Sequence, residues 1–212
     1  MQKLIVLMII FLVINFCNIS FENTNQINDE IFYVGFSICS DISDVFVPGR
    51  SDVQKYFGHH SWLEITNFTN TSIYINSIEI LPLETMTIGT WQGSMHNGIF
   101  YNVETYYNGK GEFSKKNSAY KSVLLNDFKL NYLISILGKP ENDIWTYNDN
   151  CSYFAEKIWN EITDVEINSG IIKSPLNLYN YILRNGGKQG FVMSAKKANL
   201  YYRGKNPIEF EL

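Results

Sequence analysis

The first half of the chain carries short runs in which apolar and polar residues alternate, a pattern that predicts β-strands. Ile31–Phe36 is rich in aromatic and β-branched residues, and Ser61–Thr66 alternates from one residue to the next. Three more runs of this kind lie at 71–80, 85–91 and 99–107. Loops are expected around Pro48-Gly49 and over Gly93–Gly98, because both stretches carry residues that favour turns. The first half is therefore predicted to consist mainly of strands.

The second half changes to helical spacing. Leu125–Leu137 repeats its apolar residues every three or four positions and is followed by Gly138 and Pro140, which stop helices. After Asn150, the stretch Cys151–Trp159 places its apolar side chains on one helical face. Two helices are therefore expected here.

A third helix is expected to begin at Ser174-Pro175, because serine caps helices and proline suits the first helical position. It is expected to end at Gly186-Gly187, and 190–202 to return as a last strand. Strands followed by helices predict an α+β protein. The length of 212 residues suits one domain with a core of its own, predicted to cover residues 31–212.

The N-terminus indicates where the protein works. Lys3 is followed by Leu4–Ile14, an uncharged apolar run that suits a secretory signal and is short for a membrane span. Residues 1–20 are thus predicted to be a signal peptide, or a lipoprotein signal with Cys17 as its cysteine, and 21–30 a polar linker. An uncleaved membrane anchor is the other interpretation. The protein is expected to be exported, to the periplasm, the cell surface or the medium, with any membrane attachment made through the N-terminus.

Charge limits the partners. The formal net charge is −4, and the basic residues are not clustered, so nucleic acid is not an expected partner. No cofactor is implied by any motif in the chain. A metal site at the adjacent His59 and His60 is a weaker interpretation, since no third ligand stands at a convincing spacing.

Two cysteines remain once a signal is removed, Cys39 and Cys151, and they invite two interpretations. In an exported protein they can form a disulfide. Alternatively, Cys151 is a nucleophile, because it lies where a helix is expected to begin. The unpaired amides and the dipole of a helix N-terminus favour a thiolate, and the same amides can face an oxyanion.

A thiol nucleophile needs a base, and the chain has three histidines. His96 lies in a glycine-flanked loop and is expected to be solvated. His59 and His60 stand directly before the strand predicted at Ser61–Thr66, where a side chain can be held rigidly beside a helix N-terminus. His60 is the favoured base, and a shift of one residue would make it His59.

These residues resemble those of a known family. Gly58–Ile65 (GHHSWLEI), followed later by Asn150–Ala155 (NCSYFA), is similar to the circularly permuted branch of the NlpC/P60 superfamily of papain-like cysteine hydrolases. The Gly89-Thr90-Trp91 segment and the Ser174-Pro175 helix entry share the resemblance. It implies an antiparallel sheet packed against helices, with Cys151 and His60 as the catalytic pair.

The resemblance also implies a third polar residue that orients the histidine. Glu64 on the histidine strand and Glu79 on the following one are candidates, and Asn76 is another. None of the three is singled out by the sequence.

Further side chains are predicted to contact substrate. They are Trp62 and Asn150, which lie within the two motifs, and Trp91 of the Gly89-Thr90-Trp91 segment.

The favoured function is an exported cysteine peptidase or amidase that cleaves an amide bond through a Cys151 thioester, with a peptide or peptidoglycan-like substrate. Two alternatives stay open. The same Cys-His pair would serve a lipid acyltransferase or thioesterase-like enzyme. A non-catalytic surface binding domain would instead carry a Cys39–Cys151 disulfide.

Overall fold

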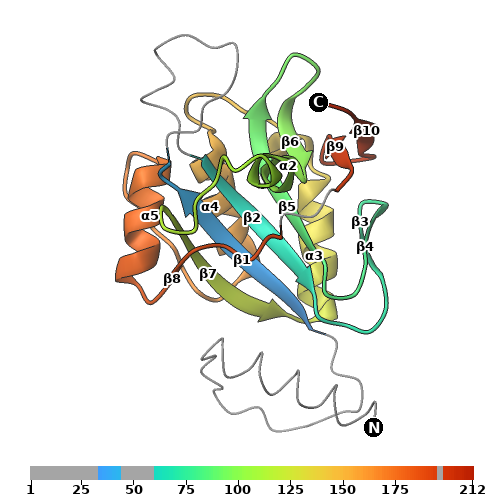
Figure 1. The fold of residues 1–212 in the computed structure, drawn as a ribbon, viewed down its shortest axis with the longest axis horizontal. Coiled ribbons are helices and arrows are strands. Elements are labelled where there is room, and N and C mark those ends of the chain that lie inside the picture. Colours follow the sequence, from blue (N-terminus) through green and yellow to red (C-terminus); the bar gives the residue numbers. More distant parts are fainter. Residues whose placement is uncertain (1–32, 44–59, 195–197) are drawn as a thin grey trace, which may run out of the picture. The chain divides into compact units, whose positions relative to one another are not determined.

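An eight-stranded antiparallel sheet forms the centre of the fold described by a computed structural model for residues 33–43, 60–194 and 198–212 (Figure 1). Its strand order is β10-β9-β6-β5-β2-β1-β7-β8. The strands are β1 (Val34–Asp41), β2 (His60–Asn67), β5 (Thr85–Gln92), β6 (Asn97–Tyr101), β7 (Ser118–Leu125), β8 (Lys188–Gln189), β9 (Leu200–Tyr202) and β10 (Ile208–Phe210). The described residues belong to one unit, Phe32–Leu212.

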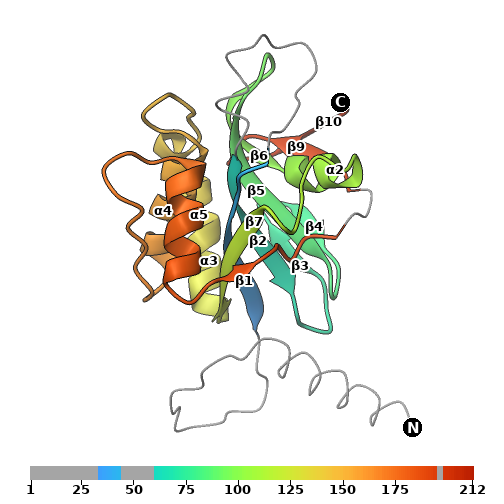
Figure 2. The same cartoon turned by 60° about the vertical axis from the view of Figure 1, so that its left-hand side comes forward.

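Helices cover the two faces of this sheet unequally. The helices are α2 (Val103–Gly109), α3 (Asp127–Leu137), α4 (Cys151–Ile162) and α5 (Pro175–Arg184), with a short 3₁₀ turn, η2, at Pro140–Asn142. In Figure 2, α3, α4 and α5 lie together on one side of the sheet, and α2 lies on the other. The α+β class with a large antiparallel sheet is therefore confirmed.

Alternation along the central strands decides which side chains enter the core. Phe36 and Leu63 are fully buried toward the helices, and Phe36 stacks on Trp159 of α4 with ring centroids 5.5 Å apart. Cys39 and Trp62 belong to the other alternating set of side chains on these strands. They are buried in a second cluster that includes Phe113, Phe191 and Met193. Since burying one large apolar side chain contributes about 1.5–3 kcal/mol, this packing holds the sheet and α4 firmly together.

Two of the predicted strands are wrong in detail. The run 71–80 is a separate hairpin, β3 (Ile73–Ile75) and β4 (Ile78–Ile80). Asn76 and Ser77 both have positive φ, 48° and 75°, as a tight hairpin turn requires. The run 99–107 is divided at Asn102, also at positive φ (64°), into β6 and the helix α2.

Other expectations also changed. Strand β7 was not expected, although it pairs with β1 along its full length. The expected strand at 190–202 is reduced to β9, and β10 follows it. The predicted signal at 1–20, the linker at 21–30 and the Pro48-Gly49 loop lie outside the described residues. Among the helices that the structure describes, none is long and apolar enough to cross a membrane.

Candidate active site

Cys151 is the first residue of α4, and the residue before it caps the helix. The Asn150 side-chain oxygen accepts hydrogen bonds from the amides of Ser152 (3.0 Å) and Tyr153 (3.1 Å), while its side-chain nitrogen donates to the Lys173 carbonyl (2.8 Å). Asn150 was predicted to contact substrate, and the structure gives it this capping role. Because the cap binds the second and third amides, the amide of Cys151 lies outside it and is available to an oxyanion.

His60 is the first residue of β2 and lies against Cys151. Its Nε2 is 2.8 Å from Oε1 of Glu104, so Nδ1 is the ring nitrogen left to share a proton with the Cys151 sulfur. Cys151 is 8% exposed and His60 5%. The pair predicted from sequence is thus brought together, on two elements that lie 91 residues apart in the chain.

Glu104, on α2, completes the arrangement and was not predicted. Its side chain is fully buried, and Oε1 accepts a second hydrogen bond from the Trp91 indole N–H (2.8 Å). The Trp91 ring packs over the His60 ring with centroids 4.0 Å apart, so Trp91 lies at the site, and its contact with substrate stays a prediction. Sequence reasoning missed Glu104 because it assigned 99–107 to a strand, and nothing local marks a glutamate that pairs with a histidine 44 residues away.

Gly89 makes this contact sterically possible. A Cβ built on Gly89 of β5 would lie 2.1 Å from Glu104 Oε1 and 2.9 Å from His60 Nε2. Any side chain at this position would occupy the space in which the carboxylate and the imidazole meet. The Gly89-Thr90-Trp91 segment therefore contributes both the gap and the indole that binds Glu104.

The three groups shift one another's pKa values. Burial alone would lower the pKa of His60, but the neighbouring Cys151 thiolate and then Glu104 raise it to about 9. Burial opposes ionisation of Cys151, yet the positive charge of His60, aided by the Ser61 backbone N–H, lowers the pKa of the thiol. For Glu104, the penalty of burial is outweighed by His60, which lowers the carboxyl pKa. The arrangement therefore favours a thiolate–imidazolium pair with a carboxylate behind it.

The predicted third residue Glu64 lies elsewhere. It is fully buried and binds the backbone amides of Val192 (2.9 Å) and Met193 (3.2 Å) and the Trp62 indole N–H (3.0 Å). Trp62, a predicted substrate contact, is itself fully buried in the second cluster. Glu64 therefore holds the segment around Val192, while Trp62 lies beside the His60 ring (centroids 6.0 Å apart) but is enclosed by the second cluster.

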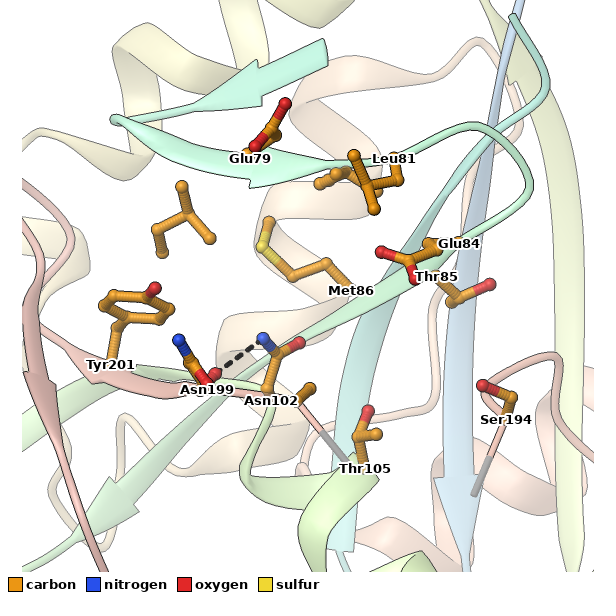
Figure 3. A pocket seen from close by; sticks show the side chains of 13 residues that line it. Glu79, Leu81, Glu84, Thr85, Met86, Asn102, Thr105, Ser194, Asn199 and Tyr201 are labelled. Atoms are coloured by element: carbon orange, nitrogen blue, oxygen red, sulfur yellow. Dashed lines mark hydrogen bonds between the residues drawn. The ribbon is translucent and has the colours of Figure 1, made fainter. Parts of the chain in front are cut away.

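Glu79 and Asn76 are also distant from His60. Asn76 forms the β3–β4 turn and donates to the Gly204 carbonyl (2.6 Å). Glu79 accepts from the Tyr74 hydroxyl (3.2 Å) and lines a cavity of about 300 Å³ between the hairpin, the start of β5 and the C-terminal segment. Figure 3 shows that this cavity is framed by Met86, Asn102 and Tyr201, among others, and not by the Cys151 pair.

His96 pairs with Asp143 and not with Cys151. His96, expected to be solvated, is 2.6 Å from Asp143 Oδ1 through Nε2, and both side chains are less than one-fifth exposed. His59, the alternative base, lies outside the described residues. Within 33–43, 60–194 and 198–212, no cluster of three or more His, Cys, Asp or Glu side chains could hold a metal ion.

Cys39 and Cys151 are both free thiols. Cys39 is buried in β1 within the second cluster, where burial and then the charge of Glu64 raise the pKa of its thiol. The two cysteines therefore differ chemically, with one favoured as a thiolate and the other kept as a thiol.

Comparisons with family models, with curated proteins and with solved structures find no match for this chain. Fold and site define it as an α+β protein with a buried Cys-His-Glu constellation at the meeting point of α4, β2 and α2.

Proposed function

We propose that this protein is a cysteine hydrolase that cleaves an amide bond through a thioester on Cys151. His60 is the base and Glu104 holds the imidazole in its working orientation. The proposal is carried by one observation: His60 lies between the Cys151 sulfur and the Glu104 carboxylate, with the pKa of the thiol lowered and that of the imidazole raised. An activated thiol with an oriented base is what nucleophilic catalysis requires.

The reaction follows from these positions. The Cys151 thiolate attacks the amide carbonyl carbon, and the Cys151 backbone N–H faces the oxyanion that forms. The His60 imidazolium then gives its proton to the departing amine, which leaves a thioester and a neutral imidazole. Water attacks the thioester while His60 takes one of its protons. The carboxylic acid product departs, and the thiolate–imidazolium pair is restored.

The order of elements supports a circularly permuted papain-like fold within the α+β class. The histidine strand β2 precedes the cysteine helix α4 in the chain. Export, and a substrate taken from cell-wall peptides, follow from the sequence resemblance and from the apolar run at 4–14. The binding-domain alternative has no support from the thiols, since Cys39 and Cys151 are unbridged.

A second function, hydrolysis or transfer of a lipid acyl chain, is favoured by the residues around the start of α4. Tyr147, whose carbonyl accepts from the Asn150 side chain (3.3 Å), is 81% exposed. On the loop that leads into α5, Ile172 is 72% exposed and Ile171 completely so. Both segments contact Asn150, the residue before the nucleophile, and exposed apolar side chains near such a site suit an apolar substrate. Both functions share the thioester and differ in the leaving group.

Labelling with a thiol-directed probe, mapped by mass spectrometry, tests the shared chemistry. Cys151 is expected to label rapidly near neutral pH, and to label at least tenfold more slowly in His60→Ala, with a smaller loss in Glu104→Gln. Cys39 is the internal control, because its buried thiol should stay unlabelled in the folded protein. Equal labelling of Cys151 in wild type and His60→Ala would refute the proposed pair.

Substrate assays then separate the two functions. Wild type and Cys151→Ala are compared on peptide amides, including cell-wall fragments, and on long-chain acyl esters. Cleavage of the amides that depends on Cys151 supports the hydrolase. Cleavage of the esters alone supports the lipid alternative.

A further inference from the structure

Three buried serine hydroxyls form a hydrogen-bonded chain directly beside the candidate pair. Ser152 Oγ of α4 is 3.0 Å from Ser61 Oγ of β2, and Ser61 Oγ is 3.0 Å from Ser40 Oγ of β1. Ser40 Oγ donates to the carbonyl of Pro175, the first residue of α5, over 2.7 Å. All three serines are completely buried. These hydrogen bonds therefore link α4, β2, β1 and α5 through buried polar contacts.

The direction of this chain is fixed by its last acceptor. A carbonyl can only accept, so the single hydroxyl proton of Ser40 goes to Pro175. Ser40 must then accept from Ser61, and Ser61 from Ser152, which uses three protons for three contacts. Loss of any one hydroxyl leaves a buried neighbour without its partner, which costs more than an ordinary hydrogen bond contributes.

Two of these serines are sequence neighbours of the candidate catalytic pair. Ser61 directly follows His60, and Ser152 directly follows Cys151. The contact between the two hydroxyls thus joins the start of β2 to the first turn of α4 at the two residues next to the base and the nucleophile. The Ser61 backbone N–H is also among the groups that lower the pKa of the Cys151 thiol, so the same stretch of β2 carries the base and acts on the nucleophile.

We propose that Ser61 and Ser152 are positioning residues that set the contact between His60 and Cys151, with Ser40 and the Pro175 carbonyl as their anchor. This inference rests on the proposed function, because it assigns the serines to the same site. The Ser61 hydroxyl acts by positioning, whereas the Ser152 hydroxyl also acts on the Cys151 thiol and helps to lower its pKa. The two serines hold together the two backbone segments whose separation decides whether the imidazole reaches the sulfur, and a displacement of about 1 Å can cost on the order of 100-fold in rate.

A double-mutant cycle on the full-length protein tests this role. Ser152→Ala is expected to slow Cys151 labelling about tenfold when His60 is present, and to keep only a small effect in a His60→Ala background, where the lost hydroxyl acts on the thiol alone. Ser61→Ala should give the same loss when His60 is present and no loss without it, since it keeps the backbone N–H and removes only the positioning hydroxyl. It also provides a test if Ser152→Ala does not fold.

Ser37→Ala is the matched control. Ser37 Oγ is 2.7 Å from Ser122 Oγ, so this variant removes a similar serine pair from the same sheet, between β1 and β7 rather than at α4. It should leave Cys151 labelling unchanged in both backgrounds. The positioning role is overturned if Ser152→Ala and Ser61→Ala label like Ser37→Ala, or if they slow labelling equally without His60. If wild-type labelling does not depend on His60 at all, the proposed function itself fails.

Discussion

At the scale of single residues, the site depends on three ionisable side chains, each of which stabilises the charged form of its neighbour. Cys151, His60 and Glu104 are each buried, and burial by itself would keep all three neutral. Their contacts reverse this, because the imidazolium lies between two negative groups. A carboxylate from a separate helix is therefore an integral part of the site.

These shifts predict how reactivity depends on pH. The thiol pKa of Cys151 is lowered, so thiolate forms below the ordinary thiol range, and the pKa of His60 is about 9, so imidazolium persists up to that pH. Substrate hydrolysis should therefore rise through the lowered thiol pKa and fall above about pH 9, because the leaving group then loses its proton donor.

Rates of thiol labelling across pH check the acidic limb. In His60→Ala the positive charge is gone while burial remains, so the labelling midpoint should move to higher pH. A midpoint that stays in place would show that His60 does not set the charge state of Cys151.

At the scale of elements, the cap of α4 connects helix formation to reactivity. Asn150 binds two amides of the first turn and fixes the helix start against the Lys173 carbonyl. Asn150→Ala is expected to lower the free energy of unfolding by about 1 kcal/mol and to slow Cys151 labelling, because the first turn loses its fixed direction. Denaturant unfolding and thiol labelling measure the two effects.

The N-cap of α3 provides the control for this prediction. Asn126 also accepts a backbone N–H with its side chain, from Lys129, and α3 carries no residue of the site. Asn126→Ala should lower stability by about as much and leave labelling unchanged. If Cys151 labels at the same rate in Asn150→Ala and Asn126→Ala, the cap of α4 does not contribute to the reactivity of Cys151.

At the scale of the whole molecule, Glu64 ties the C-terminal segment to the centre of the sheet. It binds the amides of Val192 and Met193, which lie 128 and 129 residues further along the chain. Together with Phe191, Met193 covers Cys39 and Trp62. Glu64 therefore fixes this part of the C-terminal segment against the second cluster, which contains Cys39 and Trp62.

Glu64→Ala should lower the free energy of unfolding by about 3 kcal/mol, since three donors, two of them buried, lose their acceptor. Cys39 should become accessible to a thiol probe, while Cys151 keeps its reactivity in the remaining folded protein. Glu79→Ala, which changes an exposed glutamate, should do neither. If Glu64→Ala abolished Cys151 labelling without unfolding, Glu64 would belong to the active site after all.

Most of the secondary structure could be predicted because it follows from local patterns. The alternation at Ser61–Thr66 and the capped apolar stretch after Asn150 correspond to β2 and α4. The hairpin at 71–80 was missed, although its apolar residues change spacing between Ile75 and Ile78, where the turn lies. Helix α2 could not be predicted, because Val103–Tyr107 has β-branched and aromatic residues and only Asn102 at positive φ redirects the chain.

The sequence by itself determined the α+β class and the start of the cysteine helix, and it offered Cys151 and His60 as a candidate pair, since each depends on neighbouring residues. Only the tertiary structure decided that Glu104 orients the histidine, that Gly89 leaves room for it, and that Glu64 and Trp62 belong to the core. The physical reason is that these roles depend on contacts between distant segments. A strand pattern specifies which side chains share a face, but not which helix will lie against that face.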